Sequence, residues 1–207
     1  VVPSLGRDFP DTLRNALRCD PDVIMVGEVR DEMTAEISMR AAISGHLLLT
    51  TLHAMEASAA PIQLIRMGVP AYQVADAMRA VVSQRLIRVL CTHCRIPQAP
   101  TVDELIRLDY DPEAAQQIVD NASSYQFHHH NEEGCSECTR GYRGRTMVSE
   151  VMIVGDHERE LIMSDERSSL SLRRMAMKNG MHTIQQDGVE KAAHGVTSLA
   201  ELRRVVG

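Results

Sequence analysis

Two apolar segments each end in a residue suited to acid–base chemistry. Val23–Val26 leads into Glu28, and the segment from His46 to His53 ends in a histidine. In open α/β sheets, ligands collect at the carboxyl ends of the strands. A carboxylate there could orient or deprotonate a water molecule, or hold a metal ion through its water shell. The alternative is that Glu28 and His53 are ordinary turn residues at strand ends.

Four of the five cysteines form two C-x-x-C pairs, the spacing of a tetrahedral zinc site. Arginines near the pairs would offset the charge of four thiolates, and we expect a structural zinc ion. Two disulfides or a thioredoxin-type redox pair are the alternatives, and His93 and the run His128–His130 could compete as ligands. Cys19 is left alone. The expected ligands are Cys91, Cys94, Cys135 and Cys138, and the arginines are Arg95, Arg140, Arg143 and Arg145.

The carboxylate and the imidazole require a strand–helix–strand unit. The run Val23–Val26 predicts a strand buried on both faces. Asp31 can cap a helix over Glu32–Ile43 that ends at Gly45, and residues 46–53 predict a second buried strand. The two strands should therefore be parallel, with Glu28 and His53 at one edge. Thr50 or Thr51 lies just below that edge, able to bond a phosphate or a water, whereas His46 lies at the opposite end and is mainly structural.

The remaining patterns predict further elements and three segments. Residues 1–90 form the core with the two strands, 91–145 a small cysteine-bearing subdomain, and 146–207 a helical region. Helices are predicted over 10–18, 56–67, 70–90, 102–108 and 112–121, a strand over 145–154, and three or four short helices after Asp156.

Composition restricts the class of protein. The 207 residues are 44% hydrophobic, which suits a globular core, and the net charge of −6 argues against a nucleic-acid surface. No apolar run has the length of a membrane span, and no signal peptide opens the chain. We interpret the chain as a piece of a longer protein. A phosphate-gripping G-x-x-x-x-G-K-[ST] loop is absent, since the only lysines, Lys178 and Lys191, follow Met177 and Glu190.

Taken together, these segments resemble the secretion ATPases that drive type II secretion and type IV pilus assembly, and related conjugation motors. Leu13 to Asp31 resembles their Walker B region and Gly45 to Ala54 their His box. Gln84 to Cys94 and Gly134 to Arg145 resemble the tetracysteine element of the assembly branch, which retraction motors look to lack. The tail, with G-M-H-T-I-Q-Q-D-G, is also similar.

The resemblance implies an α/β fold, a partial RecA-like P-loop NTPase core with a parallel sheet, in a hexameric ring with Mg-ATP at the subunit interfaces. It implies that Glu28 is the catalytic glutamate, with His53 near the γ-phosphate. Arg30, Thr51 and His46 would line the nucleotide site. The motor would lie at the inner face of the bacterial cytoplasmic membrane and contact the cytoplasmic domain of a platform or docking protein.

The chain departs from the family in lacking the Walker A loop, the acidic box and the N-terminal arginine fingers. We therefore expect the isolated 207 residues not to hydrolyse ATP, because positioning the phosphates is most of phosphoryl-transfer catalysis. Two other classes stay open. One is a non-catalytic zinc-dependent interaction module, and the other is a zinc-ribbon nucleic-acid binder, which the acidic charge and the scarcity of aromatic residues disfavour.

Overall fold

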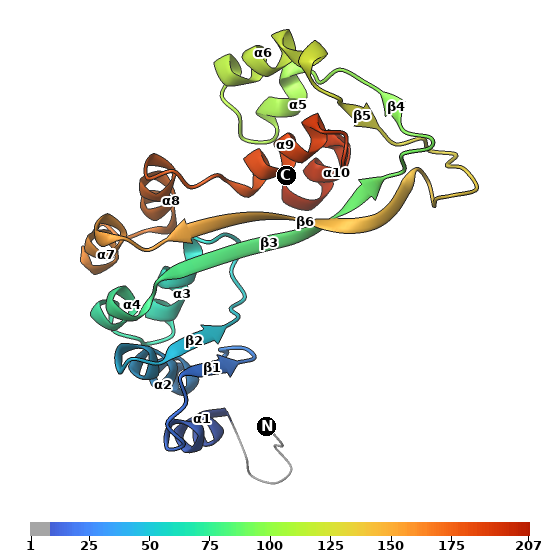
Figure 1. Ribbon diagram of the computed structural model, residues 1–207. Helices are drawn as coiled ribbons and strands as arrows, with labels where there is room; N and C mark the ends of the chain where they lie inside the picture. Colours follow the sequence, from blue (N-terminus) through green and yellow to red (C-terminus); the bar gives the residue numbers. More distant parts are fainter. Residues whose placement is uncertain (1–8) are drawn as a thin grey trace. The chain divides into compact units, whose positions relative to one another are not determined.

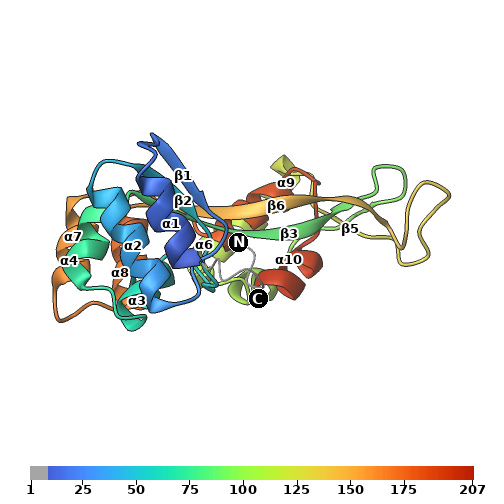
Figure 2. The same cartoon turned by 90° about the horizontal axis from the view of Figure 1, so that it is seen from below.

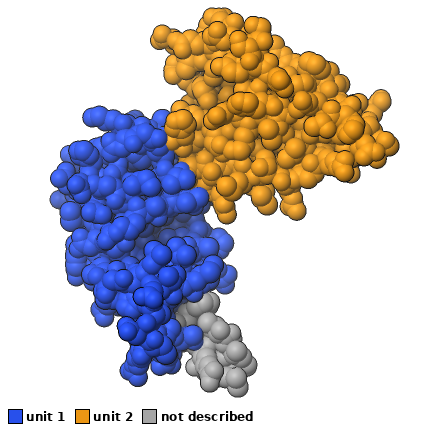
Figure 3. Space-filling view, in the orientation of Figure 1, with its two compact units in different colours: residues 1–82, 151–181 blue, residues 83–150, 182–207 orange. Residues whose placement is uncertain are grey.

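The structure, a computed structural model, describes residues 9–207 and contains two compact units (Figures 1 and 3). One unit contains residues up to 82 together with 151–181, and the other contains 83–150 together with 182–207. Each unit thus combines an early and a late part of the chain. The three-part division expected from the motifs, at residues 90 and 145, stays a prediction about domain organisation.

A strand–helix–strand unit forms the start of the first compact unit, as predicted. β1 (Val23–Val26) and β2 (Leu47–Thr50) pair in parallel, with Val23 opposite Leu47 and Val26 opposite Thr50. They lie side by side in both ribbon views (Figures 1 and 2). The connecting helix α2 (Glu32–Ile43) begins after Asp31, whose carboxylate accepts a hydrogen bond from the backbone N–H of Thr34 at 2.8 Å.

The other helices of the first compact unit are α1 (Phe9–Leu17), α3 (Ala59–Arg66), α4 (Ala71–Ala77), α7 (Asp156–Met163) and α8 (Ser169–Lys178).

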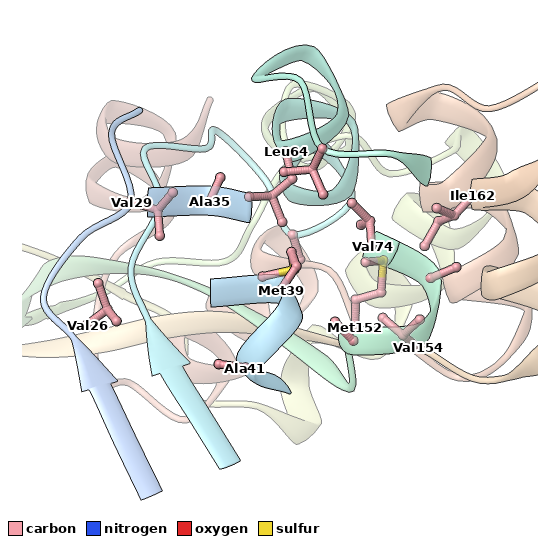
Figure 4. Packing of buried hydrophobic residues seen from close by; sticks show 14 of the residues in the cluster. Val26, Val29, Ala35, Met39, Ala41, Leu64, Val74, Met152, Val154 and Ile162 are labelled. Carbon is pink, nitrogen blue, oxygen red and sulfur yellow. The ribbon is translucent and has the colours of Figure 1, made fainter. Parts of the chain in front are cut away.

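The core of this unit lies on one side of β1 and β2. Ile24 and Val26 of β1 pack into it, and Figure 4 shows Val26 and Val29 in the same cluster as Ala35 and Met39 of α2. The expectation that β1 is buried on both faces is wrong, and β2, which was expected to be buried, is only partly so. Burial alternates along β1, and Met25 is 77% exposed and Leu47 55% exposed. The described residues supply a cover for only one face of this pair of strands.

The predicted helix over residues 70–90 is present in its first part and wrong for the rest. Helix α4 ends at Ala77, Met78 is already extended, and β3 (Ala80–Leu90) follows. Exposure along β3 alternates with a period of two, so that Ser83 and Ile87 are buried while Val82 and Leu86 are each 58% exposed. Several β-branched residues in this stretch suit a strand. Its partner β6 (Tyr142–Ile153) lies far along the chain, and a local pattern does not reveal that pairing.

The second compact unit has its own aliphatic core. Ile87 of β3 and Val148 of β6 pack in one cluster with residues of the terminal helices, among them Leu199 and Leu202. The predicted helices after residues 101 and 111 are present, each beginning at a side-chain cap, Thr101 and Asp111. The elements of this unit besides β3 and β6 are β4 (Ile96–Pro97), α5 (Val102–Ile106), α6 (Pro112–Asp120), a 3-10 turn over Ala122–Ser124, β5 (His128–His129), α9 (Ile184–Ala193) and α10 (Leu199–Val206).

Candidate functional site

Glu28 and His53 meet where β1 and β2 end. The Nε2 atom of His53 forms an ion pair with the Oε1 atom of Glu28, and the Nε atom of Arg30 donates to Glu28 Oε2 at 2.5 Å. The side chain of Glu28 is 17% exposed, whereas those of Arg30 and His53 are 73% and 85% exposed. Both oxygens of one half-buried carboxylate are thus held by groups that reach in from solvent.

The backbone after the two strands explains this meeting. The parallel register ends at Val26 and Thr50, and the N–H of Val29 continues the pairing by donating to the carbonyl of Thr51 at 3.1 Å. The hydroxyl of Thr51 donates to the carbonyl of Gly27 at 2.7 Å. These two bonds fasten the segments that carry Glu28 and His53 to each other. In this arrangement the Thr51 hydroxyl serves the local backbone.

The structure does not bring His46 to this group. His46 precedes β2, and its Nδ1 atom lies 3.0 Å from the carbonyl of Ala41 and 3.1 Å from the Ser44 hydroxyl. These contacts are at the carboxyl end of α2, which agrees with the structural role expected for His46 from its place on the strand. Its role in a nucleotide site stays a prediction.

The four paired cysteines converge on one point in the second unit. Their ligand atoms all lie within 4.8 Å of one another, and no histidine of the described residues joins the group. The Sγ atoms of Cys91 and Cys135 are 3.7 Å apart, and those of Cys94 and Cys138 are 3.6 Å apart. Four sulfurs placed tetrahedrally at about 2.3 Å from Zn²⁺ are about 3.8 Å from one another, so the spacing fits a tetrathiolate zinc site. A disulfide needs a much shorter separation of about 2 Å.

The close packing of these thiols shifts the pKa values of Cys94 and Cys138 in opposite directions. Burial, together with hydrogen bonds that the Cys94 thiol donates to the neighbouring sulfurs, raises the pKa of Cys94 to about 12. Burial also opposes ionisation of Cys138, but the backbone N–H of Cys135 and the adjacent thiols donate to its sulfur and lower its pKa to about 7. A metal ion that binds the four sulfurs would displace the protons that the thiols carry. Cys19 is exposed and lies outside the group.

One group of residues was not anticipated from the sequence. Glu201 of α10 is buried, and its carboxylate accepts hydrogen bonds from the side chains of Arg88 at 2.5 Å and Arg204 at 2.8 Å. The only local signal is the S-x-x-E spacing of Ser198 and Glu201, which is typical of a capping box. Ser198 does cap α10, but the Glu201 side chain binds arginines instead.

None of the helices in the described range 9–207 combines the length and the apolar character that crossing a membrane requires.

Sequence comparison matches residues 1–204 to the model of a family described as "Type II/IV secretion system protein". Type II secretion system protein E of Pseudomonas aeruginosa is 40% identical over 206 residues, which is 99% of this chain and 38% of that protein. The type IV pilus assembly ATPase PilB of the same organism is 38% identical over 205 residues, again 99% of this chain, and 34% of that protein.

Solved structures share the fold. The ATPase DotB of Legionella pneumophila superposes with a TM-score of 0.63 at 21% identity and covers 95% of this chain and 42% of its own. The pilus retraction motor PilT with bound ADP superposes with a TM-score of 0.62 at 23% identity, over 95% of this chain and 43% of its own. The α/β architecture is therefore that of the RecA-like secretion ATPases. The chain spans less than half the length of each of these relatives.

Proposed function

This chain belongs to the type II/IV secretion system family, and we propose that it is the part of a motor ATPase that carries the catalytic carboxylate. The parent protein would hydrolyse ATP to power type II secretion, type IV pilus assembly or a related conjugation system. The observation that carries this proposal is the contact of Glu28 with His53 at the carboxyl ends of two adjacent parallel strands. That is where ligands collect in open α/β sheets.

We assign the acid–base role to Glu28. Its carboxylate would orient the attacking water and accept its proton, and His53 would move from Glu28 toward developing negative charge on the phosphoryl group. Mg-ATP, when bound, supplies that group. Arg30 and His53 each contact one carboxylate oxygen here, and each oxygen keeps a further lone pair for a water, so Glu28 could act after His53 moves toward the phosphate. Their high exposure permits such a movement.

The rest of the nucleotide site would come from other parts of the parent protein or from neighbouring subunits. The chain contains no G-x-x-x-x-G-K-[ST] loop, so the triphosphate is gripped elsewhere. The exposed apolar residues of β1 and β2, such as Met25 and Leu47, fit a sheet that continues beyond the described residues. We propose a hexameric ring at the inner face of the cytoplasmic membrane, docked on the cytoplasmic domain of a platform protein.

We also propose that the four cysteines bind one structural Zn²⁺. The sulfur spacing and the single closed group of four soft donors support this ion over harder cations. Four cysteine ligands leave no open coordination position, so the metal would serve the fold and take no part in the hydrolytic chemistry.

A phosphate-release assay on the full-length parent tests the catalytic role. We expect Glu28→Gln to lower kcat about 100-fold or more while ATP binding persists, because the general base is lost. Glu36→Gln is the matched control, since Glu36 is an acidic residue of α2 that pairs with Arg40 on the surface. Unchanged turnover of the Glu28→Gln protein would exclude the assigned role.

The isolated 207 residues should release no phosphate above background, because the phosphate-gripping loop is absent from them. The same assay on this chain measures it. Robust turnover that Glu28→Gln abolishes would contradict this expectation and would mean that the chain holds a complete active site.

A further inference from the structure

The segment between α9 and α10 is fastened to the strand that leads into the first cysteine pair. The hydrogen bonds involve backbone and side-chain atoms on both sides of Cys91, so that the segment is held before and after this ligand. They run from the Thr197 hydroxyl to the carbonyl of Arg88 at 2.9 Å, from the N–H of Leu90 to the carbonyl of Val196 at 2.9 Å, and from Arg95 Nη1 to the carbonyl of Gly195 at 2.5 Å.

A stack of side chains continues this connection from the second cysteine pair. Tyr142 follows Cys138 closely in the chain, and the Arg88 guanidinium lies 4.0 Å from the centroid of its ring. The ring of His130 stacks on Tyr142 at a centroid distance of 4.9 Å. The Tyr142 hydroxyl lies 3.0 Å from that of Ser198, the N-cap of α10. The residue that begins β6 therefore contacts both β3 and the start of α10.

Glu201 makes the position of Arg88 energetically important. The Glu201 side chain is fully buried, and Arg88 supplies it with hydrogen bonds from both its backbone N–H at 3.0 Å and its guanidinium at 2.5 Å. Moving Arg88 away would remove two of the four hydrogen bonds that hold this buried carboxylate, the others coming from Arg204. A buried charge that loses its partner raises the free energy of the folded state. We therefore expect α10 to undock from the core, because this exposes Glu201 to water.

We propose that metal binding by the four cysteines and docking of α10 are coupled, so that α10 responds to the occupancy of the metal site. The inference rests on the proposed zinc site. The metal would hold the end of β3 and the start of β6 together, which keeps Tyr142 on Arg88 and Arg88 on Glu201. Without the metal these two segments separate more easily, and α10 loosens with its buried residues Leu199 and Leu202. Coupling of this kind is reciprocal, so weakening the α10 contacts must weaken metal binding.

Zinc affinity of the whole chain, measured by competition with a chromophoric chelator, tests the coupling. We expect Ser198→Ala and Glu201→Gln each to raise the zinc dissociation constant about 5- to 100-fold, although neither residue is a ligand. Ser168→Ala is the matched control, because Ser168 is also a serine N-cap, that of α8, in the other compact unit. It should leave the dissociation constant unchanged. Equal affinities of all four proteins would overturn the inference.

Hydrogen exchange gives a second test. It uses the unsubstituted chain, so its result does not depend on whether a variant folds. Stripping zinc with a chelator should speed amide exchange in α10 at least tenfold and leave α8 unchanged. If one zinc ion binds per chain but exchange in α10 does not respond, the coupling is refuted and the zinc proposal stands. If elemental analysis finds no zinc after purification in its presence, both proposals fail.

Discussion

Glu28 and Glu201 are both glutamates bound by arginine, yet their surroundings give them different uses. Glu28 lies at the end of a strand, and its partners Arg30 and His53 are largely exposed. Glu201 is fully buried and receives hydrogen bonds from Arg88 and Arg204. A carboxylate whose partners can leave is available for chemistry, whereas one sealed in an ion-pair network serves the fold.

Stability should depend on pH through Glu201. Burial alone would raise its pKa, but hydrogen bonds from Arg204 and Arg88 outweigh burial and lower the pKa to about 2. In the unfolded chain a glutamate has a pKa of about 4.3. The stabilisation is therefore complete above that value and is lost as the pH falls toward 2.

Glu201→Gln should lower the free energy of unfolding by about 2–4 kcal/mol at pH 7, because two arginines lose a buried anion. The difference between the two proteins should shrink as the pH falls from about 4.5 toward 2. Urea denaturation of both across this range measures it. A difference that stays constant with pH would show that Glu201 contributes through packing and not through its charge.

Helix α2 positions the candidate catalytic residues by connecting the strands that carry them. Its start is set by Asp31, whose carboxylate accepts from both the N–H and the hydroxyl of Thr34 at 2.8 Å. Its end is set by Gly45, whose φ of 106° suits glycine and turns the chain into β2. The cap at Asp31 and the turn at Gly45 set the length of the α2 connection between β1 and β2. They thereby set which residues lie at the ends of the two strands.

Removal of the Asp31 cap should destabilise the first compact unit. We expect Asp31→Ala to lower the free energy of unfolding by about 1 kcal/mol, since the first turn of α2 loses its side-chain acceptor. Asp31→Asn keeps an acceptor oxygen at the same place and should cost much less. Chemical denaturation of the three proteins compares them, and equal losses for Ala and Asn would mean that charge, not capping, is responsible.

The two compact units of the chain differ in what holds them. The first contains the Glu28–His53 pair and an aliphatic core that includes Ile24, Ala35 and Leu64. The second contains the four cysteines beside its own core. A tetrathiolate metal contributes folding free energy directly, so its removal should act on the second unit.

Chelation with EDTA should unfold the region from Cys91 to Arg145 and leave β1, α2 and β2 protected. Elemental analysis should give one zinc ion per chain, lost in Cys135→Ser and kept in Cys19→Ser, since Cys19 lies outside the group of four. Limited proteolysis with and without EDTA locates the change. Metal-free protein with unchanged melting would refute a structural zinc site.

Local patterns identified the βαβ unit because its signals are close in sequence. The apolar run before Glu28, the cap at Asp31 and the turn at Gly45 all act on neighbouring backbone. The two C-x-x-C pairs likewise predicted that their four cysteines come together, because this spacing is typical of a tetrathiolate metal site.

The sequence alone thus determined the family, the crossover and the candidate ligands. The tertiary structure decided which face of β1 is covered, that residues 80–90 form a strand, and that Glu201 binds Arg88. The last two of these depend on a partner far along the chain. The pairing of β3 with β6 overrides a helical pattern, and the position of α10 turns an apparent capping glutamate into a buried ion pair. Burial and long-range pairing are properties of the packed chain, so no local window of sequence contains them.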